Sequence, residues 1–105
     1  MIARIWDART SSPHDTQRYQ QVFDTEVLSQ LSGVAGFRGA CLLAREDHGT
    51  MAIRTITLFE SLVAVRRFAG ESYQREHVTP RARAILLGSD PAITHFEVLS
   101  THRPA

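Results

Sequence analysis

The amino-acid sequence predicts a single α+β domain with the element order strand, helix, strand, strand, helix, strand. Segments in which apolar residues alternate are interleaved with two segments in which they recur at helical spacing. The stretch TITLFESLVAVRRFAG, residues 55–70, joins a strand directly to an amphipathic helix. The chain of 105 residues is long enough for one domain with its own core.

The first strand and the first helix follow from residues 1–33. In MIARIWDART, Trp6 shares a face with Ile2, Arg4 and Ala8, whereas Ile5 lies on the other face. Ser12 and Pro13 are the expected N-cap and first residue of the helix, and Gly33 its expected end. One apolar stripe follows helical spacing through Tyr19, Val22, Phe23, Val27, Leu28 and Leu31.

A hairpin is expected next. Residues 40–45 and 51–60 are the second and third strands, and residues 46–49 form the turn between them. On the third strand, Phe59 shares a face with Ile53, Thr55 and Thr57. Arg54, Ile56 and Leu58 lie on the opposite face.

The rest of the chain supplies the second helix and the last strand. The helix is expected over residues 61–69, capped by Ser61 and ended by Gly70, with Leu62, Val65, Phe68 and Ala69 facing inward. A short helix over 81–87 should end at Gly88, and Asp90-Pro91 should precede a strand over 92–99. The domain therefore spans residues 1–99, and residues 100–105 are expected to form a flexible tail.

This order is that of the ferredoxin-like split βαβ fold, a four-stranded antiparallel sheet with both helices on one face. Each strand offers apolar residues to both faces, in the pairs Trp6 and Ile5, Phe37 and Leu42, Ile56 and Phe59, and Ile93 and Phe96. Because the helices cover only one face, the sequence predicts a homodimer that packs sheet against sheet.

Composition narrows the partners and the chemistry. The net charge is +1, and the twelve basic residues, all arginine, are scattered, so we expect no nucleic acid partner. The lack of lysine excludes Schiff-base chemistry. No apolar run reaches the ~20 residues of a membrane span, and no signal peptide is recognisable. The single Cys41 is expected to be a small buried residue in a reducing compartment, so we expect a cytoplasmic location.

The chain up to about Leu99 resembles the antibiotic biosynthesis monooxygenase (ABM) domain family. The resemblance lies in MIARIW at the start, GFRGACLL on the second strand, ITLFES on the third and FAG after the second helix. It implies a dimeric α+β barrel. Members of the family include cofactor-independent monooxygenases of aromatic polyketides, quinol oxygenases, haem-degrading monooxygenases and many proteins of no known activity.

The resemblance also suggests where a site would lie. The haem-degrading branch uses an asparagine on the first strand, a tryptophan at the end of the third and a histidine after the second helix. This chain has no asparagine, the tryptophan position reads Phe59, and the histidine position reads His77. His77 is therefore the candidate catalytic residue, since histidine side chains, with an unperturbed pKa of about 6.5, suit proton abstraction near neutral pH. The alternative is a solvated histidine on a polar turn.

Four aromatic residues are candidates for substrate binding: Trp6, Phe59, Phe68 and Tyr73. Apolar side chains dominate small-molecule pockets, and the Tyr73 hydroxyl could orient a phenolic ligand. Ordinary core packing is the alternative for each. No histidine pair has metal-ligand spacing, so we expect no metal site.

Three functions fit these residues. The first is a cofactor-independent monooxygenase that oxidises a small aromatic substrate with O₂ and needs no cofactor. The second is a haem-binding or haem-degrading protein, and the third is a dimer that binds a small ligand without catalysis.

Overall fold

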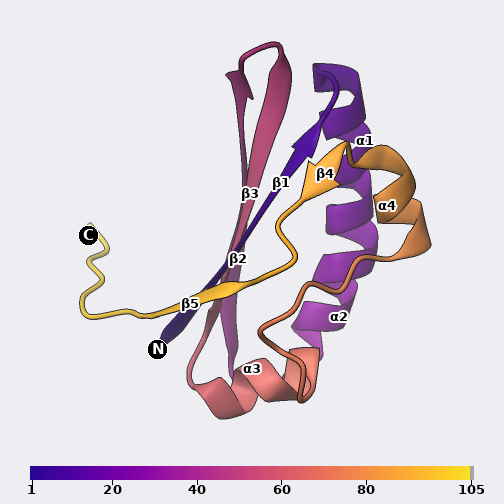
Figure 1. Ribbon diagram of the computed structural model, residues 1–105. Helices are drawn as coiled ribbons and strands as arrows, with labels where there is room; N and C mark the ends of the chain where they lie inside the picture. Colours follow the sequence, from indigo (N-terminus) through magenta and orange to yellow (C-terminus); the bar gives the residue numbers. More distant parts are fainter. Residues whose placement is uncertain (105) are drawn as a thin grey trace.

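The computed structural model describes residues 1–104, which form a sheet with helices on one face (Figure 1). The strands are β1 (Ile2–Thr10), β2 (Phe37–Asp47), β3 (Thr50–Phe59), β4 (Gly88–Ser89) and β5 (Thr94–Glu97). All pairs are antiparallel, in the order β2-β3-β1, and both β4 and β5 pair with the remaining edge of β1. The predicted ferredoxin-like fold is confirmed.

The last strand of the sheet is broken, which differs from the prediction of one strand over 92–99. The side chain of Asp90 accepts a hydrogen bond from the Ala92 N–H at 2.9 Å, and Pro91 has no N–H to donate. This turn separates β4 from β5, so the sheet keeps four strand positions although it has five strands. Gly88 belongs to β4, because the preceding helix α4 (Pro80–Ile85) already ends at Ile85.

The first helical segment is one continuous helix interrupted in its middle by a π-helical turn. It consists of α1 (Pro13–Val22), the π-helix η1 (Phe23–Val27) and α2 (Leu28–Ser32). The Ser12 side chain caps α1 by accepting from the Asp15 N–H at 3.1 Å, as predicted. In η1 the Leu28 N–H bonds the carbonyl of Phe23, five residues back. π-turns of this kind occur frequently at functional sites.

Helix α3 (Leu62–Ala69) begins and ends where predicted, but one of its four predicted inward residues, Leu62, is exposed. The Ser61 hydroxyl accepts from the Ala64 N–H, and Gly70 follows the last turn with φ of 77°. Ala64 and Val65 are completely buried, whereas Leu62, predicted to face inward, is 39% exposed. The reason is a close approach: a Cβ on Gly36 would lie 2.7 Å from the Ala64 Cβ, so the Ala64 side of α3 faces the core.

A β-bulge changes which β2 side chains face the helices. The pairing with β3 shifts between Phe37, opposite Phe59, and Gly39, opposite Leu58. The extra residue reverses the alternation, so Phe37 and Leu42 both pack against the core instead of lying on opposite faces. The prediction that this pair serves both faces is therefore wrong.

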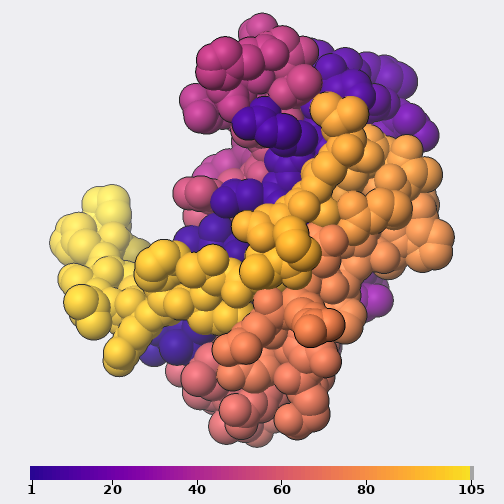
Figure 2. Space-filling model, in the orientation of Figure 1, coloured from indigo at the N-terminus to yellow at the C-terminus, as the bar shows by residue number. Residues whose placement is uncertain are grey.

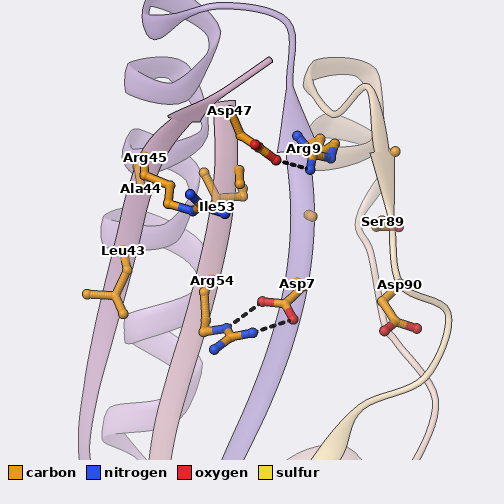
Figure 3. Close-up of a pocket in the computed structure, with 13 residues that line it drawn as sticks. Asp7, Arg9, Leu43, Ala44, Arg45, Asp47, Ile53, Arg54, Ser89 and Asp90 are labelled. Carbon is orange, nitrogen blue, oxygen red and sulfur yellow. Dashed lines mark hydrogen bonds and ion pairs between the residues drawn. The ribbon is translucent and has the colours of Figure 1, made fainter. Parts of the chain in front are cut away.

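The sheet face away from the helices is hollowed (Figure 2), and both charged and apolar side chains line the hollow (Figure 3). Its concavity, of about 710 Å³, is lined by β1, β2, β3 and residues 88–90. Arg54 donates to both Asp7 oxygens at 2.7 and 3.0 Å, and Arg9 pairs with Asp47. Toward the other end of this face Phe96 is 55% exposed. The open face is therefore charged at one end and apolar at the other.

Two further observations concern the ends and helices of the molecule. Residues 100–104 form no helix or strand and run away from the sheet (Figure 1), and residue 105 of the predicted tail lies outside the described residues. None of the helices in the described part of the chain is long and apolar enough to cross a lipid bilayer.

Candidate functional site

A second cavity, of about 680 Å³, lies on the helix side of the sheet. Side chains of β1 and β3 form one wall, and the others are formed by residues of α1, η1, α2 (Leu28–Ser32) and α3, by the segment 77–79 and by Ile93. Four aromatic side chains line the cavity: Trp6, Tyr19, Phe23 and Phe68. A few polar groups interrupt this lining, which is the usual composition of a small-molecule site.

The fold brings three of the five predicted site residues to this cavity: Trp6, Phe68 and His77. They come from β1, α3 and the segment after α3, far apart in sequence. His77 is exposed at the cavity wall, so it is accessible to a ligand and to water. The fold of the chain, and not proximity in sequence, therefore brings these three side chains together.

Phe59 and Tyr73 are not among the lining residues. Phe59 is completely buried, because the rings of Phe37 and Phe68 both lie 5.9 Å from it. Tyr73 packs edge-on against His95 at 5.4 Å, and the Arg66 guanidinium lies over its ring at 5.3 Å. Phe59 thus packs behind Phe68, whereas Tyr73 lies outside the cavity lining.

Trp6 presents its ring to the cavity, but its N–H is engaged elsewhere. The indole Nε1 donates to a Glu76 carboxylate oxygen at 3.1 Å and to the Asp90 carbonyl at 2.9 Å. The ring packs against Tyr19 with centroids 6.3 Å apart. Trp6 can therefore offer a ligand apolar surface, while its N–H joins β1 to the segments on either side of α4.

Glu76 is the centre of this junction. Its carboxylate also accepts from Arg83 Nη2 at 2.7 Å and from the Ser89 hydroxyl at 2.7 Å. Burial acts to raise the pKa of Glu76, but the hydrogen bonds from Ser89, Arg83 and Trp6 outweigh it and lower the pKa. Glu76 thus remains ionised and holds the chain just before His77.

Arg4 is the charged group deepest in the cavity wall. The residue is only 6% exposed, and burial lowers its pKa to about 10, so it remains cationic at neutral pH. Its Nη1 donates to the Tyr73 carbonyl and to His95 Nε2, the latter at 3.1 Å. The Phe68 ring lies 5.9 Å from the guanidinium carbon, within the range of a cation–π contact.

Two buried polar atoms of cavity-lining residues have no hydrogen-bond partner within residues 1–104: Thr55 Oγ1 and Glu26 Oε2. The Tyr19 phenol near Thr55 does not reach hydrogen-bond geometry with it. Burial raises the pKa of Tyr19 to about 12, although the Thr55 hydroxyl opposes this, so the phenol stays protonated. Unpartnered buried oxygens are rare in folded proteins, so these two leave hydrogen-bonding capacity unused in the cavity wall.

The described residues offer no set of metal ligands. No group of three or more histidine, cysteine or carboxylate side chains that could hold a metal ion occurs in residues 1–104. Any chemistry argued from these residues therefore rests on a histidine, a buried guanidinium, hydroxyl groups and a carboxylate.

Sequence reasoning missed Arg4, Glu26 and Thr55 as site residues. Arg4 carried a signal, since an arginine on the inward face of an alternating strand requires a special environment. Thr55 carried a similar but weaker signal on β3. For Glu26 there was none, because its position depends on the π-turn, which the periodicity does not reveal.

Comparison with known proteins supports the fold. No protein-family model and no curated protein matches the sequence. Among solved structures, the monooxygenase ActVA-Orf6 of Streptomyces coelicolor, determined with nanaomycin D, is 17% identical. Its TM-score is 0.67 over 99% of this chain and 92% of that chain.

Two further structures are similar over nearly their whole length. The haem degrader MhuD from Mycobacterium tuberculosis, with two haems in its active site, is 19% identical with a TM-score of 0.65, over 98% of this chain and 100% of that one. SnoaB, a cofactor-independent oxygenase from Streptomyces nogalater, is 18% identical with a TM-score of 0.61, over 95% of each chain. The predicted resemblance to ABM proteins is thus confirmed at the level of fold.

Proposed function

We propose that this protein is a cofactor-independent monooxygenase that oxidises a small aromatic substrate, of quinol or polyketide type, with O₂. The observation that carries the proposal is the cavity on the helix side of the sheet, where aromatic walls surround a few polar groups. The fold shared with two oxygenases supports it. Aromatic walls that shield a carbanion from water favour its reaction with O₂ over its reprotonation.

In the proposed reaction, His77 accepts a proton from an acidic C–H of the substrate. The resulting carbanion transfers an electron to O₂, recombination of the two radicals forms a C–O bond, and protonated His77 returns its proton to give the hydroperoxide. Loss of water from the hydroperoxide then leaves a carbonyl, so one oxygen atom enters the product and the other leaves as water. The Thr55 hydroxyl would stabilise negative charge on the substrate oxygen.

Oxygen consumption tests this proposal directly. We expect substrate-dependent O₂ uptake with a hydroxyanthrone or a hydroquinone, reduced at least tenfold in His77→Ala. The control is His14→Ala, which removes a histidine in the first turn of α1 whose side chain is 80% exposed. No uptake across a panel of such substrates, or an undiminished rate in His77→Ala, would contradict the proposal.

Haem binding is the second candidate, favoured by His77 as the histidine at the cavity wall. Haem titration should then shift the Soret band, and His77→Ala should abolish the shift. An unchanged spectrum would exclude it. Stabilisation by an aromatic ligand without any turnover would instead indicate a binding protein.

We also propose that the protein is a homodimer formed through the open sheet face. Apolar side chains support this, since Phe96 is 55% exposed and Leu43 is 47% exposed on that face. Sedimentation or light scattering at micromolar concentration should give twice the mass of the chain. A monomer under these conditions would overturn the proposal.

A further inference from the structure

Arg4 is a buried cation that no acidic side chain neutralises. None of the ion pairs among residues 1–104 includes it. The two hydrogen-bond partners of its guanidinium are neutral. They are the Tyr73 carbonyl and the His95 ring, whose pKa is lowered by burial and by the charge of Arg4. Burying an unpaired charge raises the free energy of the folded protein. An anion that pairs with this guanidinium would offset much of that cost.

One edge of the guanidinium remains available. Both recorded contacts use Nη1, and within the described residues Nε and Nη2 have no hydrogen-bond partner. Neither nitrogen belongs to the enclosed polar atoms that lack a partner, and Arg4 lines the cavity. Two adjacent N–H groups of this kind match the two oxygens of a carboxylate.

The charges around the cavity favour an anion as well. Arg4 and Arg67 line it, against the single carboxylate of Glu26. Glu26 is itself partly compensated, because Arg81 Nη1 lies 3.4 Å from its Oε1. The cavity therefore has an excess of positive charge at neutral pH.

We infer that the ligand of this cavity is an aromatic carboxylic acid, whose carboxylate pairs with Arg4 while its rings lie against Trp6 and Phe68. The inference rests on the proposed function, in which an aromatic substrate occupies the cavity, and it specifies the substrate class. A neutral phenol or quinol would leave the buried guanidinium without a counter-ion.

The test compares two ligands with the same ring system, 2-naphthoate and the neutral 2-naphthamide. Titration calorimetry of the wild-type protein at pH 7 should give an affinity at least tenfold higher for 2-naphthoate, because charge-assisted bidentate pairs are much stronger than neutral hydrogen bonds. Equal affinities, or no binding of 2-naphthoate at millimolar concentration, would overturn the inference.

Variants assign the preference to one residue. Arg4→Gln should lose it, and Arg4→Lys, which keeps the charge without the fork, should keep part of it. The matched control is Arg66→Gln, since Arg66 is an exposed arginine of α3 outside the cavity lining. A preference retained in Arg4→Gln would contradict the inference. If Arg4→Gln does not fold, the ligand pair on the wild-type protein still decides.

The same measurements separate this inference from the proposed reaction. Binding is measured without O₂, so a strong preference for 2-naphthoate stands even if no substrate is ever oxidised. Conversely, oxidation of a neutral hydroxyanthrone with the same KM in wild type and Arg4→Gln would overturn the inference while the oxygenase proposal stands.

Discussion

The unpartnered hydroxyl of Thr55 allows a prediction whose sign is unusual. Replacing a buried residue normally destabilises a protein, but Thr55→Val removes an oxygen that is buried without a hydrogen bond. Leaving such a group unsatisfied costs about 1–3 kcal/mol. Valine has nearly the same shape and is also β-branched, so the strand is not disturbed. We expect Thr55→Val to stabilise the protein by about 1 kcal/mol. This is the low end of the range, because neighbouring residues relax around the unpaired hydroxyl and lower its cost.

The matched control lies two residues further along the same face of β3. The Thr57 hydroxyl is 3.4 Å from the Arg4 carbonyl and donates to it, and the residue is 5% exposed. Thr57→Val should therefore destabilise the protein by about 0.5–1.5 kcal/mol. The same substitution at two positions of one strand is thus expected to give opposite signs, with a difference of about 2 kcal/mol.

Urea unfolding monitored by the fluorescence of the single tryptophan measures both variants. Protein concentration must be held constant, because association would shift the transition. In thermal unfolding, 1 kcal/mol corresponds to about 4–8 °C for a domain near this size. If Thr55→Val lowers stability as much as Thr57→Val does, the Thr55 hydroxyl is bonded in solution and the reasoning about the cavity wall is refuted. Weaker binding of 2-naphthol by Thr55→Val would show that the hydroxyl serves a ligand.

Three further predictions use the same unfolding assay. Gly36→Ala should cost more than about 2 kcal/mol of stability, because φ is 92° and the new Cβ would lie 2.7 Å from the Ala64 Cβ. Gly33→Ala should be neutral or stabilising, because φ is −87° and no atom is nearer than 3.9 Å to the new Cβ. Equal effects of the two substitutions would contradict this. The pKa of His95 is lowered by burial, so the unfolded chain takes up the proton first and stability should fall as pH drops below about 6.5; a His95→Gln variant with the same pH dependence would be the contrary result. Glu76→Gln should cost about 1–2 kcal/mol and shift the tryptophan emission, since it weakens the hydrogen bonds to three partners; an unchanged spectrum would count against the junction.

Much of the fold was predictable because it depends on local signals. Neighbouring residues determine the Ser12 and Ser61 caps, the alternation along β1 and β3 and the turn before Gly49. The structure confirms each of these predictions. The errors occur where tertiary contacts decide. The exposure of Leu62 depends on how closely Gly36 approaches α3, and the bulge before Gly39 depends on the register with a partner strand.

The candidate site was predictable only in part, for a related reason. Residue type identifies which side chains can do chemistry, and this pointed to His77. It does not show which aromatic side chains line a cavity and which lie behind it. Phe59 and Phe68 look equivalent in sequence, yet Phe59 is enclosed by two other rings while Phe68 reaches the cavity.

The position of Phe59 has a consequence for the chemistry. A tryptophan is implied at the end of the third strand in the haem-degrading branch, and here that position is a fully buried phenylalanine. The only tryptophan of the chain, Trp6, uses its N–H for Glu76 and Asp90. Neither residue can therefore donate a hydrogen bond to a ligand. The remaining donors at the cavity include Arg4, Tyr19, Thr55 and His77, and of these Arg4 carries a permanent charge. Recognition in this cavity is accordingly expected to depend on a guanidinium group on β1.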